Sequence, residues 1–155
     1  MGMGIDGELQ LWASGALNSV TNYSTNAYDQ ATAGRHIENS EEMGMAVYVS
    51  AFTAGTSDAY TFKVISDSVG TPASPSSPAT VATMTLTAAQ VTALLTTNGG
   101  PGSFFLAIGP NTINQQYISG ELDISNTPGT ITLSAYLMLE ADFSQNVPQP
   151  ANYTL

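Results

Sequence analysis

The sequence has no cysteine and almost no positive charge: of its 155 residues, only Arg35 and Lys63 are basic. Without cysteine, disulfide frameworks, thiolate zinc sites and cysteine nucleophiles are excluded. Two basic side chains cannot neutralise a row of phosphates, so we expect no nucleic-acid binding and no attachment to an anionic membrane surface. The single histidine, His36, leaves too few imidazoles for a histidine metal cage.

Charge of either sign is scarce. Charged residues make up 9% of the chain, against about 25% in an average protein. Twelve acids against two bases give a net charge of −10, but the hydrophobic fraction of 43% excludes disorder. The first residues have no basic region, and no apolar run approaches membrane-spanning length. We therefore expect one domain without signal peptide or transmembrane helix, made in the cytoplasm.

Apolar and polar residues alternate along most of the chain, the pattern of half-buried β-strands. The strand segments that this pattern predicts are 5–12, 43–53, 60–65, 81–86, 104–108, 117–124 and 130–141, with 23–29 as a weak polar candidate. Within 43–53, the alternation places Met45, Val47, Val49 and Ala51 on one face and Tyr48 and Phe52 on the other. The turn-forming residues 53–58 predict a hairpin connection to the next strand.

One segment has the pattern of a helix. Thr87 and Gln90 form a capping box, apolar residues follow at helical spacing, and the glycine-rich residues 98–102 end the segment. Residues 70–78 contain three prolines and predict a surface loop. Together these patterns predict an all-β protein, an antiparallel jelly roll or β-sandwich of about eight strands with one short helix. We expect a single domain over 1–142 and a polar C-terminal tail over 143–155.

Enzyme signatures are mostly absent: the sequence has no nucleophile elbow, no P-loop and no zinc-protease helix motif. His36 lies near Glu38, Glu41 and Glu42, which is compatible with an acid–base cluster. The interpretation that we favour is a polar loop or a subunit contact, because no nucleophile or orienting group accompanies the histidine. Trp12 has two readings as well, core packing at a sheet edge or an interface anchor.

Three pairs of acids are spaced so that both carboxylates share one face of a strand. This spacing is compatible with glycoside hydrolysis or a bound Ca²⁺ ion, and it is also typical of the solvent face of an alternating strand. We favour the solvent face, and we predict no catalytic residue, no cofactor and no metal site. The pairs are Asp6 with Glu8, Glu121 with Asp123, and Glu140 with Asp142.

The order of several short motifs resembles a family of tailed-bacteriophage capsid cement proteins. Residues 6–14, Asp-Gly-Glu-Leu-Gln-Leu-Trp-Ala-Ser, resemble the family's opening strand, and residues 24–29, Ser-Thr-Asn-Ala-Tyr-Asp, resemble its next segment. Arg35, the Gly44 before Met-Ala-Val-Tyr-Val, the last strand 132–142 and the ending Asn152-Tyr153 also fit. The chain departs from the family in lacking an aliphatic-Gly pair after Asp29 and in its enlarged loop over 87–102.

The resemblance implies a jelly-roll domain that forms homotrimers on the capsid exterior. There it would bridge neighbouring major capsid proteins near threefold or quasi-threefold axes, with no enzyme activity and no cofactor. We expect the contacts to subunits or capsid to come from the N-terminal segment, the 35–42 loop and the C-terminal tail, which are poorly suited to the domain's own core. The candidate interface residues are Asp6, Leu9, Trp12, Arg35, His36, Glu41 and Tyr153.

Other function classes remain open at the level of sequence. A fibre head or carbohydrate-binding β-sandwich would use aromatic side chains as stacking faces. The candidates for this role are Trp12, Tyr23, Tyr28, Tyr48 and Tyr117. An enzyme is the least favoured class, because no substrate type is indicated by any motif.

Overall fold

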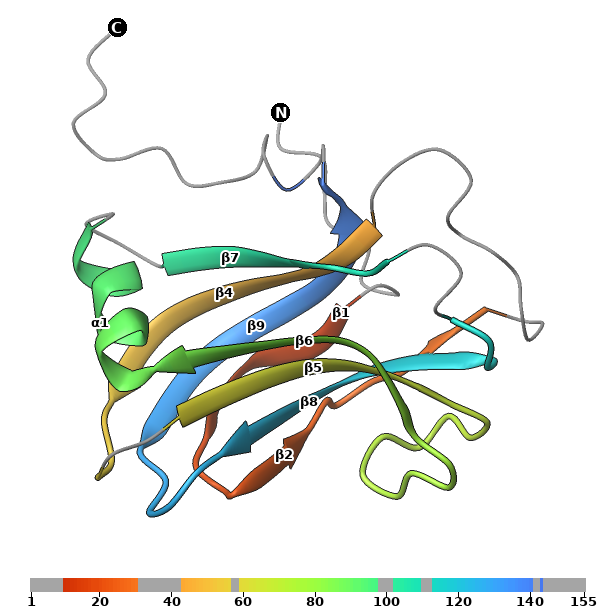
Figure 1. The fold of residues 1–155 in the computed structure, drawn as a ribbon, viewed down its shortest axis with the longest axis horizontal. Helices are drawn as coiled ribbons and strands as arrows, with labels where there is room; N and C mark the ends of the chain where they lie inside the picture. The colour runs from red at the N-terminus through yellow and green to blue at the C-terminus, as the bar shows by residue number, and fades with distance from the viewer. Residues whose placement is uncertain are drawn as a thin grey trace, which may run out of the picture.

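Nine strands in the described residues form two antiparallel sheets that pack as a β-sandwich (Figure 1). The computed structural model describes residues 10–30, 43–56, 59–97, 102–109, 113–140 and 143. Sheet A consists, in spatial order, of β1 (Gln10–Leu17), β9 (Thr130–Leu139), β4 (Met43–Thr53) and β7 (Gly102–Ala107). Sheet B consists of β2 (Thr21–Tyr23), β8 (Tyr117–Ile124), β5 (Ala59–Asp67) and β6 (Ala79–Thr87), and β3 (Tyr28–Asp29) also pairs with β8.

The strands are connected as a jelly roll. β1 pairs with β9, β2 with β8, β4 with β7, and β5 with β6. These four pairs form one long hairpin that is rolled so that alternate pairs lie in opposite sheets. The short helix α1 (Ala88–Thr97) contacts β4, β6 and β7 at one end of the sandwich. The predicted fold class, an all-β sandwich with one short helix, is confirmed.

The core lies between the two sheets and follows the predicted alternation in the last two strands. The inward residues of β8 and β9 are fully buried, whereas most of their neighbours on the outer faces, Ser119 and Met138 excepted, remain partly exposed. The capping box of α1 is also as predicted: the Thr87 N–H donates to Gln90 Oε1 at 2.8 Å, and the Gln90 N–H donates to Thr87 Oγ1 at 3.2 Å. The buried inward residues are Ile118, Leu122, Ile124, Ile131, Leu133, Ala135 and Leu137.

A β-bulge overturns part of the pattern predicted for β4. The register of β4 against β9 shifts by one residue between Val49 and Ala51. Because one extra residue reverses the alternation, Ala51 is exposed and Phe52 packs edge-on against the core ring of Tyr60, with ring centroids 5.1 Å apart. The prediction that Ala51 shares the inner face and Phe52 the outer face was wrong.

The hairpin predicted over residues 53–58 was also wrong. This connection joins β4 in sheet A to β5 in sheet B, so it carries the chain from one sheet to the other. The weak candidate 23–29 corresponds to two separate short strands, β2 and β3, and the first described strand begins at Gln10 and runs on to Leu17. Turn residues mark where a strand ends, but they do not show which sheet receives the next strand.

Trp12 of β1 joins the two sheets. Its side chain is 2% exposed and lies against Gly120 of β8, where an added Cβ would come within 3.0 Å of the indole ring. The indole Nε1–H donates a 3.1 Å hydrogen bond to the carbonyl oxygen of Tyr23 on β2. The register of β1 shifts on both sides of Trp12, so Leu11 and Trp12 are both buried although they are adjacent. Of the two readings of Trp12, the structure favours core packing.

We expect Gly120→Ala to destabilise the fold by about 1–3 kcal/mol, because the added methyl group must displace the indole or the strand. Gly15→Ala on β1 is the matched control, since the nearest atom to its added Cβ is 3.7 Å away. Urea unfolding followed by the emission of Trp12, the single tryptophan, measures both variants. Equal unfolding midpoints for the two variants would contradict this role of Gly120.

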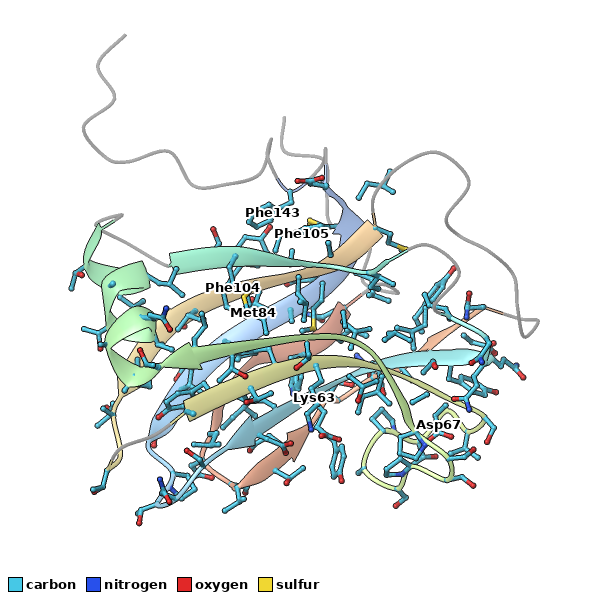
Figure 2. All side chains as sticks on the ribbon, viewed as in Figure 1. Lys63, Asp67, Met84, Phe104, Phe105 and Phe143 are labelled. Carbon is cyan, nitrogen blue, oxygen red and sulfur yellow. The ribbon has the colours of Figure 1, made fainter. Side chains whose placement is uncertain are left out.

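Asp67, at the end of β5, holds the loop that follows it. Its side chain is buried, and its carboxylate accepts hydrogen bonds of 2.6–3.3 Å from four backbone N–H groups. Burial opposes the charged form, but these donors outweigh that effect and hold the pKa of Asp67 below its usual value. Both ends of the loop are therefore tied to one carboxylate (Figure 2). The donors belong to Ser68, Val69, Ser76 and Ser77.

Replacing this carboxylate should be costly and should alter the acid response. We expect Asp67→Ala to lose about 2–4 kcal/mol, because four N–H donors lose their acceptor. Since the folded pKa is depressed, the stabilisation is complete above the unfolded pKa of about 3.9 and is lost as the pH falls through the folded pKa. Urea unfolding between pH 7 and pH 2 should show a shallower acid loss for the variant. Identical pH profiles would contradict the prediction.

Candidate interaction surface

Charge is distributed unequally between the two sheets. The four strands of sheet A contain no charged residue. Among the described residues, every charged side chain is in sheet B except Glu140, which directly follows β9. In a chain with a net charge of −10, the outer sides of these four strands therefore carry no charge, and Glu140 is the charged residue next to them in the described part of the chain. The charged residues of sheet B are Asp29, Lys63, Asp67, Glu121 and Asp123.

Aromatic side chains gather on the outer side of sheet A. The Tyr48 ring meets the Tyr136 ring edge-on at a centroid distance of 6.1 Å, and Phe143 packs 6.2 Å from Tyr48 and 5.4 Å from Phe105. All four rings are half-buried. Figure 2 shows Phe105 and Phe143 on the side of β7 that faces away from sheet B, whereas Phe104 points toward sheet B. We call this surface, formed by Tyr48, Phe105, Tyr136, Met138 and Phe143, the aromatic face.

The rings of the aromatic face cover the backbone beneath them. Gly44 and Ala46 occupy outward positions of β4, yet both are buried. A Cβ on Gly44 would lie 2.4 Å from the Leu106 carbonyl oxygen and 2.6 Å from the Phe105 ring, so glycine lets β7 and this ring pack closely on β4. Met138 is 7% exposed and accepts a long contact of 3.9 Å from the Tyr48 hydroxyl to its sulfur. The aromatic face is thus a second, smaller apolar cluster outside the sandwich core.

The hydroxyls of the aromatic face do not bring charge to it. Burial raises the pKa of Tyr48 above its usual value of 10.0, and the neighbouring Tyr136 raises it further. Tyr136 in turn accepts a 3.0 Å hydrogen bond on its hydroxyl oxygen from Gln10 Nε2. The Tyr48 hydroxyl therefore stays neutral at physiological pH, and the face offers hydrogen-bonding groups without ionic ones.

The outer side of sheet B has the opposite chemistry. Lys63 Nζ lies 2.7 Å from Glu121 Oε1 and also bonds the carboxylate of Asp123. Partial burial opposes the ionisation of Asp123, but Lys63 outweighs it and lowers the pKa of Asp123. Glu121 and Asp123 therefore form an ion-paired group with Lys63 on the outer side of sheet B.

The structure places one of the predicted interface residues. Trp12 is in the core, and the other six candidates are outside the described residues: Asp6, Leu9, Arg35, His36, Glu41 and Tyr153. The aromatics proposed as stacking faces do not form one platform. Tyr48 is on sheet A, whereas Tyr23, Tyr28 and Tyr117 belong to strands of sheet B. In the described part of the chain, no cluster of three or more potential metal ligands occurs, and no helix is long and apolar enough to span a membrane.

The described chain begins and ends beside the aromatic face. Gln10, where β1 starts, pairs with Tyr136, and Met43, where β4 starts, pairs with Leu139 at the end of β9. These ends therefore lie together at one end of sheet A (Figure 1). The six remaining candidates are outside the described residues: in sequence, residues 1–9 precede Gln10, residues 31–42 lie between Gln30 and Met43, and the C-terminal tail follows β9.

Sequence reasoning missed most of the aromatic face. The alternation over 130–141 assigned Tyr136 and Met138 to the outer side, which is correct, but it did not show that they meet Tyr48 and Phe105. A signal was available: outer positions of a solvated strand are usually polar or charged, and these positions carry large uncharged side chains.

Comparison with models of known protein families and with curated proteins finds no match for this chain. The resemblance to capsid cement proteins is supported at the level of an antiparallel two-sheet β-sandwich. The function must therefore be inferred from the structure of the chain itself. The aromatic face is the feature from which we infer it, because solvated strand faces are usually polar or charged.

Phe143→Ala should destabilise the protein by about 1–3 kcal/mol, because Phe143 makes two ring contacts that cover the outer side of β4 and β7. Val20→Ala is the control, since Val20 is 56% exposed and should change stability by less than about 0.5 kcal/mol. Urea unfolding at equal protein concentrations gives both values. If Phe143→Ala behaves like the control, Phe143 does not stabilise the face.

Proposed function

We propose that this protein is a structural virion protein, a trimeric cement protein on the exterior of a tailed-bacteriophage capsid. It bridges neighbouring major capsid proteins at threefold or quasi-threefold positions and has no enzymatic role. The observation that carries the proposal is the aromatic face, a cluster of uncharged, partly buried rings on a strongly acidic chain. The choice of the major capsid protein as the partner rests on the resemblance of the sequence to capsid cement proteins.

The chemistry of the two outer faces suits a protein that is bound on one side and solvated on the other. Burying Lys or Glu at an interface is costly unless each charge is paired, whereas Tyr, Phe, Met, Ser and Thr are desolvated at much lower cost. Aromatic side chains are also the residues that most often dominate binding energy. The acidic outer side of sheet B would face solvent, away from the packaged DNA, and would keep the free protein soluble.

Binding to the assembled shell accounts for cementing in thermodynamic terms. A ligand that binds only the intact shell stabilises it by RT ln(1 + [L]/Kd), about 2.7 kcal/mol per site when the free ligand is at 100 times its Kd. A ligand that touches two capsid subunits at once also opposes their separation. Many such sites on one shell would raise the temperature at which it opens.

The test is add-back of the purified protein to expanded shells that lack it. We expect the protein to sediment with the shells and the shells to open at a higher temperature, measured by the release of packaged DNA to a fluorescent dye. Unexpanded precursor shells give the comparison for the shell state. Shells that bind the protein but open at the same temperature would contradict cementing, and failure to sediment would contradict a capsid partner.

The carbohydrate-binding alternative is tested with the same preparation. We expect no heat of binding when the protein is titrated with a panel of bacterial surface glycans. Saturable glycan binding that is lost in Tyr48→Ala would instead favour a recognition module that uses the aromatic face. The Tyr23→Ala variant, changed on sheet B, is the matched control.

A further inference from the structure

We propose that the aromatic face is the docking site for a basic segment of the partner protein, one that places arginine side chains against the rings. This inference deepens the proposed function and rests on it for the identity of the partner, the major capsid protein. What it adds is the chemistry of the contacting segment, which carries positive charge beside apolar groups. Two features support it: the acidic residues that border the aromatic face, and the rings themselves.

Acidic residues border the aromatic face at the end of sheet A where β4 begins and β9 ends. Glu140 is exposed and directly follows β9. In sequence, Glu42 directly precedes Met43 of β4, and Asp142 directly precedes Phe143 of the aromatic face. Because consecutive Cα atoms are about 3.8 Å apart, chain connectivity alone keeps the backbone of these two acids next to this end. We call Glu42, Glu140 and Asp142 the acidic border.

The sequence supplies little positive charge to balance the acidic border. Three segments adjoin β1, β4 and β9 in sequence, namely 1–9, 31–42 and 140–142, and they contain seven of the twelve acids, with Arg35 as their only base. The other base, Lys63, forms its ion pairs on the outer side of sheet B. A second copy of the chain would bring the same excess of acids, so like-charge repulsion disfavours it as the occupant. A basic segment brings the complementary charge.

The rings of the aromatic face attract a cation although they carry no charge. The face of a tyrosine or phenylalanine ring attracts a cation that lies within about 6 Å of its centroid. The Tyr48 centroid is 6.1 Å from that of Tyr136 and 6.2 Å from that of Phe143, so a cation between two rings can lie within reach of both. The Tyr48 hydroxyl donates toward the Met138 sulfur, and its oxygen can accept a hydrogen bond from the same cation.

Arginine suits this combination better than lysine. The guanidinium group is planar and weakly hydrated, stacks on aromatic rings, and binds a carboxylate through two parallel hydrogen bonds. Its aliphatic stem covers apolar surface while the charged head stays at the edge. An arginine can therefore cover the rings with its stem and plane and reach the acidic border with its N–H groups.

The direct experiment titrates the isotope-labelled full chain with a short peptide of alternating arginine and leucine, followed by backbone amide NMR shifts. We expect saturable shifts in β4, β7 and β9 around the aromatic face. The same peptide with citrulline, which has nearly the shape of arginine but no charge, should bind more weakly. This comparison separates recognition of a cation from simple apolar contact.

Two double variants, each with one Glu→Gln and one Asp→Asn change, test the acidic border. Glu140→Gln/Asp142→Asn changes the border, and Asp29→Asn/Glu121→Gln removes the same charge from sheet B. We expect the border variant to bind the arginine peptide about three- to tenfold more weakly at low salt, and the control variant to bind it like wild type. The difference should shrink as added salt screens the charges. Circular dichroism checks that both variants fold.

Three results would overturn the inference: equal affinity for the arginine and citrulline peptides, shifts confined to sheet B, or an equal loss of affinity in both double variants. Sedimentation with expanded shells separates it from the proposed function. If the peptide binds the aromatic face as expected but wild type does not bind shells, the docking chemistry stands and the cement function fails. If wild type binds and protects shells but both double variants bind them equally well and the peptide ignores the face, the cement function stands and the inference is wrong.

Discussion

The contact between Trp12 and Gly120 is the constraint on which the sandwich depends. The indole crosses from sheet A to sheet B, fits only because residue 120 has no side chain, and donates a hydrogen bond to the backbone of β2. A chain without disulfides and with few ion pairs must obtain its stability from apolar burial and backbone hydrogen bonds. This contact holds β1 of sheet A directly against β8 of sheet B.

The scarcity of charge is not uniform over the molecule. Lys63 forms ion pairs with Glu121 and Asp123 on the outer side of sheet B, and the Asp67 carboxylate accepts hydrogen bonds from backbone N–H groups of a loop. The strands of sheet A carry no charge. In an unbound sandwich both outer sides are solvated, so solvation alone does not explain why one side carries tyrosine and phenylalanine rings and the other carries the strand charges. Binding through the aromatic side would explain the difference, because desolvating an uncharged surface costs less free energy than desolvating an ionic one.

Local patterns in the sequence predicted where strands and the helix occur better than they predicted which strands pair with one another. The capping box of Thr87 and Gln90 was correct because both residues act within one turn of helix. The prediction that Phe52 lies on the outer face was wrong, because the bulge in β4 arises in its pairing with β9, about eighty residues away in the chain. The hairpin at 53–58 was wrong for a similar reason: the partners of β4 are β7 and β9, both distant in the chain. The aromatic face was the feature that the sequence predicted least well, since Tyr48, Phe105 and Tyr136 come from three strands that are far apart in the chain.

By itself, the sequence determined the class of the fold: an acidic, cysteine-free chain that is mostly β with one capped helix. These properties depend on composition and on contacts between near neighbours, which a linear pattern records. Only the tertiary structure decided which strands share a sheet and where the bulge reverses a face. It also decided that the uncharged strands gather in sheet A, with Tyr48, Phe105 and Tyr136 together on its outer side. The physical reason is that a jelly roll pairs strands that are far apart along the chain, so the chemistry of each face is a property of the pairing.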